Sequence, residues 1–159
     1  MKQGITRAYR AILEQGKTAY GQVVRHILEH PPPSNAFIVH CTLGKDRTGI
    51  LCALLLSLCG VPDDVVADEY SLTDIGLGNW LEHLVDAVIK HTGANEEVAR
   101  RMVGARRESM VGAIDMLKNE FGGAEGYFKS QCGLSAEEID KIKSFLIVEE
   151  KPIVGLSKN

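Results

Sequence analysis

The sequence predicts an α/β fold that is predominantly helical, with one buried central strand. Three observations support this. Apolar residues recur at helical spacing along most of the chain, Asn35–His40 is rich in branched and aromatic residues, and a long apolar run ending before Gly60 follows closely. The 159 residues are 45% hydrophobic, which suffices for one domain with a core. We expect a single domain over 1–146 and a carboxyl-terminal tail over 147–159.

The elements follow from local patterns. Two helices are expected in the first 30 residues, the second stopped by Pro31, Pro32 and Pro33. After the strand, the apolar run "GILCALLLSLC" predicts a buried helix that ends at Gly60 and Pro62. The remaining pattern predicts helices over Asp63–Tyr70, Trp80–His91, Glu96–Val103, Arg107–Phe121 and Ala124–Gln131, and a last helix from a Ser135/Glu138 capping box to Leu146.

Charge and cysteine content exclude several classes of protein. The net charge of -3 and the pI near 6.0 give no reason to expect a nucleic-acid surface or a polybasic membrane anchor. The amino-terminal segment lacks the apolar core of a signal peptide, and the longest apolar run, Ile50–Cys59, is too short to span a bilayer. The four cysteines lack metal-ligand spacing, so we expect no metal or cofactor and a reducing, cytoplasmic location.

The short connection between the predicted strand and the buried helix holds the chemistry. Backbone N–H groups converge where a strand ends and a helix begins, and the helix dipole favours an anion there. Cys41 at the start of this loop would be stabilised as a thiolate. Arg47 at its end offers a planar fork that matches two phosphate oxygens, and Gly44 permits the turn. This arrangement predicts transfer of a phosphoryl group to sulfur.

These residues also carry a family resemblance. The run "HCTLGKDRTG", His40–Gly49, resembles the signature of cysteine-dependent protein tyrosine phosphatases, and most of all the microbial tyrosine/serine and lipid phosphatase subgroup. The resemblance implies that Cys41 is the nucleophile that forms a phosphocysteine, that Arg47 clamps phosphate, that the Thr48 hydroxyl steadies the thiolate, and that His40 orients the loop. The implied phosphate-binding residues are Thr42, Leu43, Gly44, Lys45, Asp46 and Arg47.

The expected activity is hydrolysis of phosphotyrosine, and also of phosphoserine, phosphothreonine or phosphoinositide, so that the substrate is a phosphorylated protein or phospholipid. The alternative is a non-catalytic phosphate-binding remnant of a phosphatase. A rhodanese or arsenate-reductase relative is disfavoured by His40 and by the Arg-Thr-Gly ending. Lys45 has two readings: a solvated loop charge, or a group that attracts an acidic substrate.

The general acid is the open question. Tyrosine phosphatases usually supply an aspartate from a loop upstream of the cysteine, but there is no aspartate between Met1 and Ser34. Asp46 within the loop is the first choice. The acid otherwise comes from sequence that this chain lacks, or from an aspartate after the loop: Asp63, Asp64, Asp68 or Asp74.

A lone central strand poses an architectural problem. Its N–H and C=O groups need partners on both sides, yet only the tail "FLIVEEKPIVGL" has further strand-like composition. We therefore expect this chain to be the carboxyl-terminal part of a phosphatase domain, lacking amino-terminal strands, and either truncated or completed by another chain or by a homodimer partner.

Overall fold

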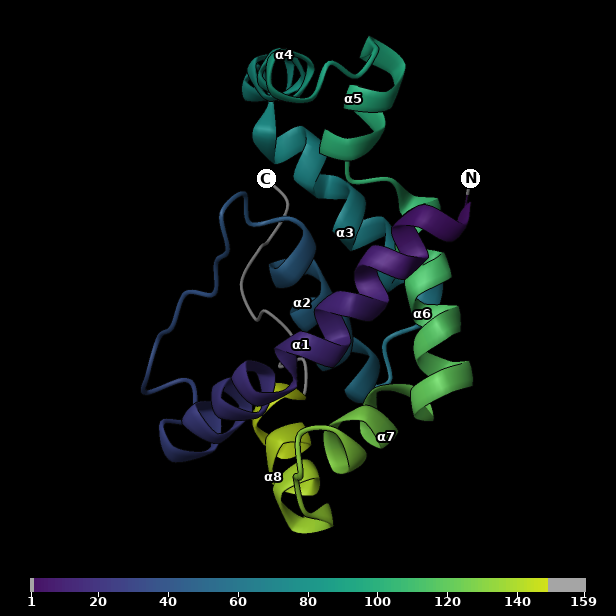
Figure 1. The fold of residues 1–159 in the computed structure, drawn as a ribbon. Helices are drawn as coiled ribbons and strands as arrows, with labels where there is room; N and C mark the ends of the chain where they lie inside the picture. The colour runs from purple at the N-terminus through teal and green to yellow at the C-terminus, as the bar shows by residue number, and fades with distance from the viewer. Residues whose placement is uncertain (1, 149–159) are drawn as a thin grey trace, which may run out of the picture.

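The structure, a computed structural model, describes residues 2–148, which form eight helices (Figure 1). None of these helices combines the length and apolarity needed to cross a bilayer. In chain order they are α1 (Lys2–Glu29), α2 (Asp46–Leu58), α3 (Asp63–Leu77), α4 (Trp80–Thr92), α5 (Glu96–Val103), α6 (Arg107–Phe121), α7 (Gly123–Ser130) and α8 (Ala136–Leu146).

Helix α1 is one continuous helix rather than the two that the sequence predicted. Its buried residues Tyr9, Leu13, Tyr20, Val24 and Ile27 share one face, which packs on α2, α6 and α8. A glycine inside a helix normally weakens it, but Gly16 is covered by a neighbouring ring: a Cβ built there would lie 2.9 Å from Tyr20. The apolar face therefore runs unbroken through the glycine.

Helix α2 lies at the centre, with α1, α3 and α7 packed around it. Ile50, Leu51, Ala53, Leu54 and Leu58 are buried on it, which confirms the predicted buried helix. The later helices also match their predicted ranges closely, including the Ser135/Glu138 capping box. The exception is α3, which continues to Leu77, well past Tyr70.

The predicted α/β class, with its buried central strand, is wrong: the described residues form helices and no sheet. No strand forms among residues 2–148, and Asn35–His40 is an extended connection with Ile38 91% exposed and Phe37 39% exposed. Figure 1 shows it as part of a long loop standing away from the helices. The physical reason is that strand composition alone cannot hold a strand, because its backbone groups need a neighbouring strand, and the described residues supply none.

Helices α4 and α5 have a small core of their own. Val85, Ala99 and Val103 are buried between them, separate from the main apolar cluster of the molecule. The two helices lie together at one end of the molecule, with α7 and α8 at the other (Figure 1). Arg100 joins them by bonding Glu82 on α4 and Glu96 on its own helix.

Candidate active site

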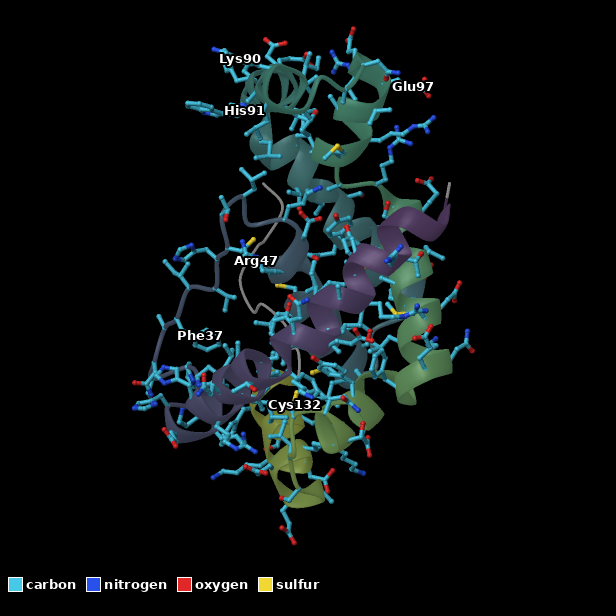
Figure 2. All side chains as sticks on the ribbon, viewed as in Figure 1. Phe37, Arg47, Lys90, His91, Glu97 and Cys132 are labelled. Atoms are coloured by element: carbon cyan, nitrogen blue, oxygen red, sulfur yellow. The ribbon has the colours of Figure 1, made fainter. Side chains whose placement is uncertain are left out.

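The loop that begins at Cys41 runs directly into the first turn of α2, which starts at Asp46 and includes Arg47. Figure 2 shows Arg47 at this point and Phe37 farther out on the same connection. Lys45 is the residue before the helix and makes no side-chain cap, so the first turn's N–H groups are left for another acceptor. An anion is the acceptor that the helix dipole favours there.

The Cys41 thiol lies against this ring of amides. Burial works against its ionisation, but hydrogen bonds from the Thr48 hydroxyl and from the backbone N–H groups of Thr48, Leu43 and Lys45 outweigh burial and lower its pKa from 9.0 to about 6. By contrast, burial raises the pKa of the Cys52, Cys59 and Cys132 thiols.

Thr48 adds a second argument for a thiolate. Its Oγ1 atom is buried and, apart from the Cys41 sulfur, has no hydrogen-bond partner among the described residues. A buried hydroxyl without a partner is costly, so it needs an acceptor. A thiolate on Cys41, whose charge the hydroxyl stabilises, is such an acceptor.

The Arg47 side chain is exposed and lies across the loop. Its Nη2 atom donates to Thr42 Oγ1 at 2.9 Å, which joins the two ends of the loop. Behind it, the hydroxyl of Tyr20 on α1 donates to the Arg47 carbonyl at 2.9 Å. The backbone of Arg47 is thus fixed to the core while its guanidinium remains open to solvent.

His40 lies outside the loop proper. Its ring is exposed, and Nδ1 lies 3.2 Å from the carbonyl oxygen of Cys41. When protonated, Nδ1 donates to that carbonyl and fixes the peptide that follows Cys41. This contact orients the Cys41 carbonyl and does not involve the Cys41 sulfur.

Lys45 is neither solvated nor extended into the loop opening. It is only 2% exposed, and its Nζ donates to the carbonyls of Met102 at 2.9 Å and Gly104 at 3.4 Å. It also lies 3.2 Å from Asp46 Oδ1. The ammonium therefore ties the loop to the end of α5, and the backbone N–H is the part of Lys45 that faces Cys41.

Asp46 begins α2 and keeps a partly exposed carboxylate, with a side-chain exposure of 40%. Its Oδ1 accepts a hydrogen bond from the Tyr9 hydroxyl at 3.2 Å, in addition to the Lys45 contact. Neither contact uses Oδ2. The Tyr9 hydroxyl lies 2.5 Å from that of Tyr70.

Three of the four candidate aspartates after the loop are engaged elsewhere. Asp63 pairs with Lys118, Asp68 pairs with Arg107, and Asp74 accepts a hydrogen bond from the Ala105 N–H at 2.6 Å. Asp64 is an exposed residue in the first turn of α3. Of the aspartates considered, Asp46 is the one that belongs to the loop itself.

Two glycines shape the loop. Gly44 has a φ of +66°, a left-handed conformation that a side chain would strain. Gly49 lets Tyr70 approach the start of α2, because a Cβ there would lie 2.7 Å from the tyrosine ring. Both positions therefore require glycine in this arrangement.

Sequence reasoning missed the second layer around the loop. Tyr9, Tyr20 and Tyr70 were expected only as apolar helix residues, and nothing in the spacing of α1 or α3 reveals where their hydroxyls bond. The carbonyls of Met102 and Gly104, which hold Lys45, were missed for the same reason. Each of these contacts joins residues that are far apart along the chain.

A cavity of about 420 Å³ lies at the opposite end of α2 and shares no residue with the loop. Its lining residues include Ser57, Pro62, Asp63, Lys118 and Gly123.

Within residues 2–148, no group of three or more His, Cys, Asp or Glu side chains is placed to hold a metal ion.

Comparison with known proteins identifies relatives. The model of the tyrosine phosphatase family matches residues 1–148. A tyrosine-protein phosphatase of Nostoc commune is 34% identical over 140 residues, covering 86% of this chain and 47% of that protein. The triple specificity protein phosphatase PtpB of Mycobacterium tuberculosis (strain ATCC 25618 / H37Rv) is 24% identical over 122 residues, covering 69% of this chain and 43% of that protein. The chain thus spans less than half the length of each relative.

Proposed function

Because the chain belongs to the tyrosine phosphatase family, we propose that it hydrolyses phosphotyrosine through a phosphocysteine intermediate. The observation that carries this proposal is the Cys41 thiol at the centre of the loop amides, with its pKa lowered to about 6. A thiol with that pKa is ionised at neutral pH and is a competent nucleophile.

The loop residues have complementary roles in this reaction. The Cys41 thiolate attacks phosphorus, the phosphorus–oxygen bond to the leaving group breaks, and the phosphoryl group is held by the amides of Thr42–Arg47 and by the Arg47 guanidinium. Thr48 stabilises the thiolate when water later breaks the phosphorus–sulfur bond and releases inorganic phosphate. His40 holds the peptide behind Cys41 in place, as its contact with the Cys41 carbonyl indicates.

Asp46 is the proposed general acid. It gives its proton to the leaving oxygen in the first step and removes a proton from the attacking water in the second. Its position supports this role, because it lies in the loop and its Oδ2 is not used by either Tyr9 or Lys45. Asp63, Asp68 and Asp74 are tied to other elements, which makes them weaker candidates.

The proposal extends to other phosphoesters. The name of the Mycobacterium tuberculosis relative records three specificities. Leu43 and Arg47 are exposed at the loop, so these two side chains do not enclose a deep pocket that would admit phosphotyrosine alone. We include phosphoserine, phosphothreonine and phosphoinositides among the candidate substrates, and the cytoplasm as the site of action.

A completing partner is part of the same proposal. Phe37–His40 carries strand-forming residues, and no backbone hydrogen bond within residues 2–148 involves its N–H or C=O groups. An extended segment in this state can pair with a strand of a second copy or of another chain.

The alternative function is a phosphate-binding module without turnover. It is favoured by one observation, the absence of an upstream aspartate before Ser34. Such a module would bind vanadate or phosphate in the same loop without hydrolysing esters.

Hydrolysis of p-nitrophenyl phosphate by the full chain separates the two functions. We expect vanadate-sensitive turnover, complete loss in Cys41→Ser with vanadate binding retained, and a loss of about a hundredfold or more in Arg47→Lys, since a point charge cannot replace the fork. Cys132→Ser is the matched control and should keep full activity. Cys132 lies in the connection between α7 and α8, away from the Cys41 loop (Figure 2). Vanadate binding with no turnover would establish the module instead.

A further inference from the structure

Two tyrosines from different helices meet behind the Asp46 carboxylate. Tyr9 on α1 is 2% exposed and Tyr70 on α3 is 3% exposed, and their rings pack edge to face with centroids 6.4 Å apart. Their hydroxyls lie 2.5 Å apart, and the Tyr9 hydroxyl reaches Asp46 Oδ1. Three helices thus contribute to one chain of hydrogen bonds that ends at the loop.

The number of protons fixes the direction of this chain. A phenol has one proton to donate, so when Tyr9 donates to ionised Asp46 it must accept from Tyr70. When Asp46 carries a proton on Oδ2, Oδ1 is the carbonyl oxygen of the acid and still accepts from Tyr9, so the direction of the chain does not change. Both hydroxyl–hydroxyl and hydroxyl–carboxyl contacts survive in either state.

The tyrosines themselves stay protonated through this change. Burial, followed by the neighbouring Tyr70, raises the pKa of Tyr9 far above its ordinary value, and burial raises that of Tyr70 to about 12. They therefore orient the carboxylate without acting as bases near neutral pH.

We propose that Tyr9, supported by Tyr70, is a positioning residue that holds Asp46 Oδ1 on the core side while Oδ2 exchanges a proton with the leaving group or water. This inference rests on the proposed phosphatase function and deepens it. Lys45 contacts the same Oδ1 at 3.2 Å, so the two contacts hold the carboxylate through one oxygen from two sides. Without the Tyr9 hydroxyl, the Asp46 carboxylate would be less well ordered before the proton transfer, and orienting it would add to the free-energy barrier.

Gly49 and Tyr70 show that the arrangement depends on close packing. The Tyr70 ring occupies the space where any other residue at position 49 would place its Cβ. The ring is thereby pressed against the first turn of α2, and its hydroxyl is brought to Tyr9. The positions of α1, α2 and α3 jointly set the carboxylate.

The test is Tyr9→Phe, which keeps the ring and removes the hydroxyl. An acid matters for a poor leaving group and little for p-nitrophenol, so we expect kcat to fall about tenfold on phenyl phosphate and less than about twofold on p-nitrophenyl phosphate. Asp46→Asn should show the same split with a larger loss, and adding Tyr9→Phe to it should widen the split no further. Equal losses on both substrates in Asp46→Asn would remove Asp46 as the acid and overturn the inference.

Tyr127→Phe is the matched control. Tyr127 is as buried as Tyr9, and its hydroxyl donates to the Leu13 carbonyl at 2.6 Å, away from the loop. Tyr127→Phe should lower the unfolding midpoint, and any change in kcat should be the same for phenyl phosphate and p-nitrophenyl phosphate. If Tyr9→Phe behaves like Tyr127→Phe, the tyrosine has a structural role alone and the inference is wrong.

Tyr70→Phe keeps the experiment decisive if Tyr9→Phe does not fold. It removes the donor to Tyr9 and should produce a smaller split of the same sign, whereas no split would overturn the inference. A wild-type chain that hydrolyses neither substrate would overturn the proposed function itself, and a wild type active on both, with no split in any tyrosine variant, would overturn the positioning role alone.

Discussion

At Cys41, ionisation is decided by a balance between burial, which favours the thiol, and the loop's hydrogen bonds, which favour the thiolate. The hydrogen bonds win because several donors converge on one sulfur. Cys52 is more buried than Cys41 and has no such hydrogen bonds, and its pKa shifts in the opposite direction.

The first consequence is a pH profile for alkylation of Cys41 by iodoacetamide. Only the thiolate reacts, so the rate should rise as pH increases through about 6 and level off above it. Thr48→Ala should move the midpoint upward, because it removes the hydroxyl that favours the thiolate. Mass spectrometry identifies the modified cysteine, and Cys41→Ser should lose the early modification.

A midpoint near 9.0, the ordinary value for a thiol, would contradict this picture. Cys52, Cys59 and Cys132 serve as internal references, since burial shifts their pKa values in the other direction. They should react slowly throughout the range in which Cys41 is already ionised.

Between elements, Lys45 links the loop to the segment after α5. A buried ammonium is stable only when its donors are bonded, and here the Met102 and Gly104 carbonyls accept from it. Removing it leaves those carbonyls and the Asp46 carboxylate with fewer partners. This contact therefore couples the loop to the base of the α4–α5 pair.

Lys45→Met should lower the free energy of unfolding in urea by about 1.5–3 kcal/mol, the range for hydrogen bonds to charged groups. The matched control is Lys118→Met, which removes an exposed lysine paired with Asp63 and should change stability by less than about 0.5 kcal/mol. Equal small effects in both variants would mean that the buried ammonium contributes no net stability.

Helices were predictable from the sequence, whereas the strand was not. The 3.6-residue period of α6 and the capping box of α8 depend on residues within a few positions, so a local pattern contains the needed information. Phe37–His40 has an equally clear local pattern, but a strand is stabilised by backbone partners elsewhere, and the described residues provide none. The composition of Phe37–His40 favours a strand, but no strand forms because no neighbouring strand lies among the described residues.

The same distinction applies to the site. Cys41, Arg47 and Thr48 were predicted as site residues because they lie within one short run, and the structure places Thr48 against the Cys41 thiol and Arg47 across the same loop. Tyr9 was not, because its partners Asp46 and Tyr70 are 37 and 61 positions away in sequence. A single sequence does not show which buried tyrosine hydroxyl meets which carboxylate.

The whole molecule has a main core around α1, α2 and α6 and a small second core between α4 and α5. The smaller core buries little apolar surface, and the extended connection at Phe37–His40 buries less still. Resistance to local opening follows the amount of buried contact. The three regions should therefore open independently.

Hydrogen exchange measured by mass spectrometry should show three classes of amide. Exchange should be slowest in α2 and α6, intermediate in α4 and α5, and fastest in residues 36–40, whose amides have no backbone partner within residues 2–148. Exchange should be repeated at several protein concentrations. Uniform protection across α2 and α4 would contradict the division into two cores, and protection of 36–40 that grows with concentration would indicate strand pairing between copies.

The contact between Gly49 and Tyr70 sets a limit for anyone engineering this protein. A library that varies position 49 alone should return almost only the parental residue, because even a methyl group collides with the Tyr70 ring at 2.7 Å. A larger residue is accessible only if position 70 shrinks at the same time, and that change discards the hydroxyl next to Tyr9. The two sites must therefore be randomised as a pair, and each solution that relieves the collision by shrinking position 70 gives up the hydroxyl that bonds Tyr9 beside Asp46.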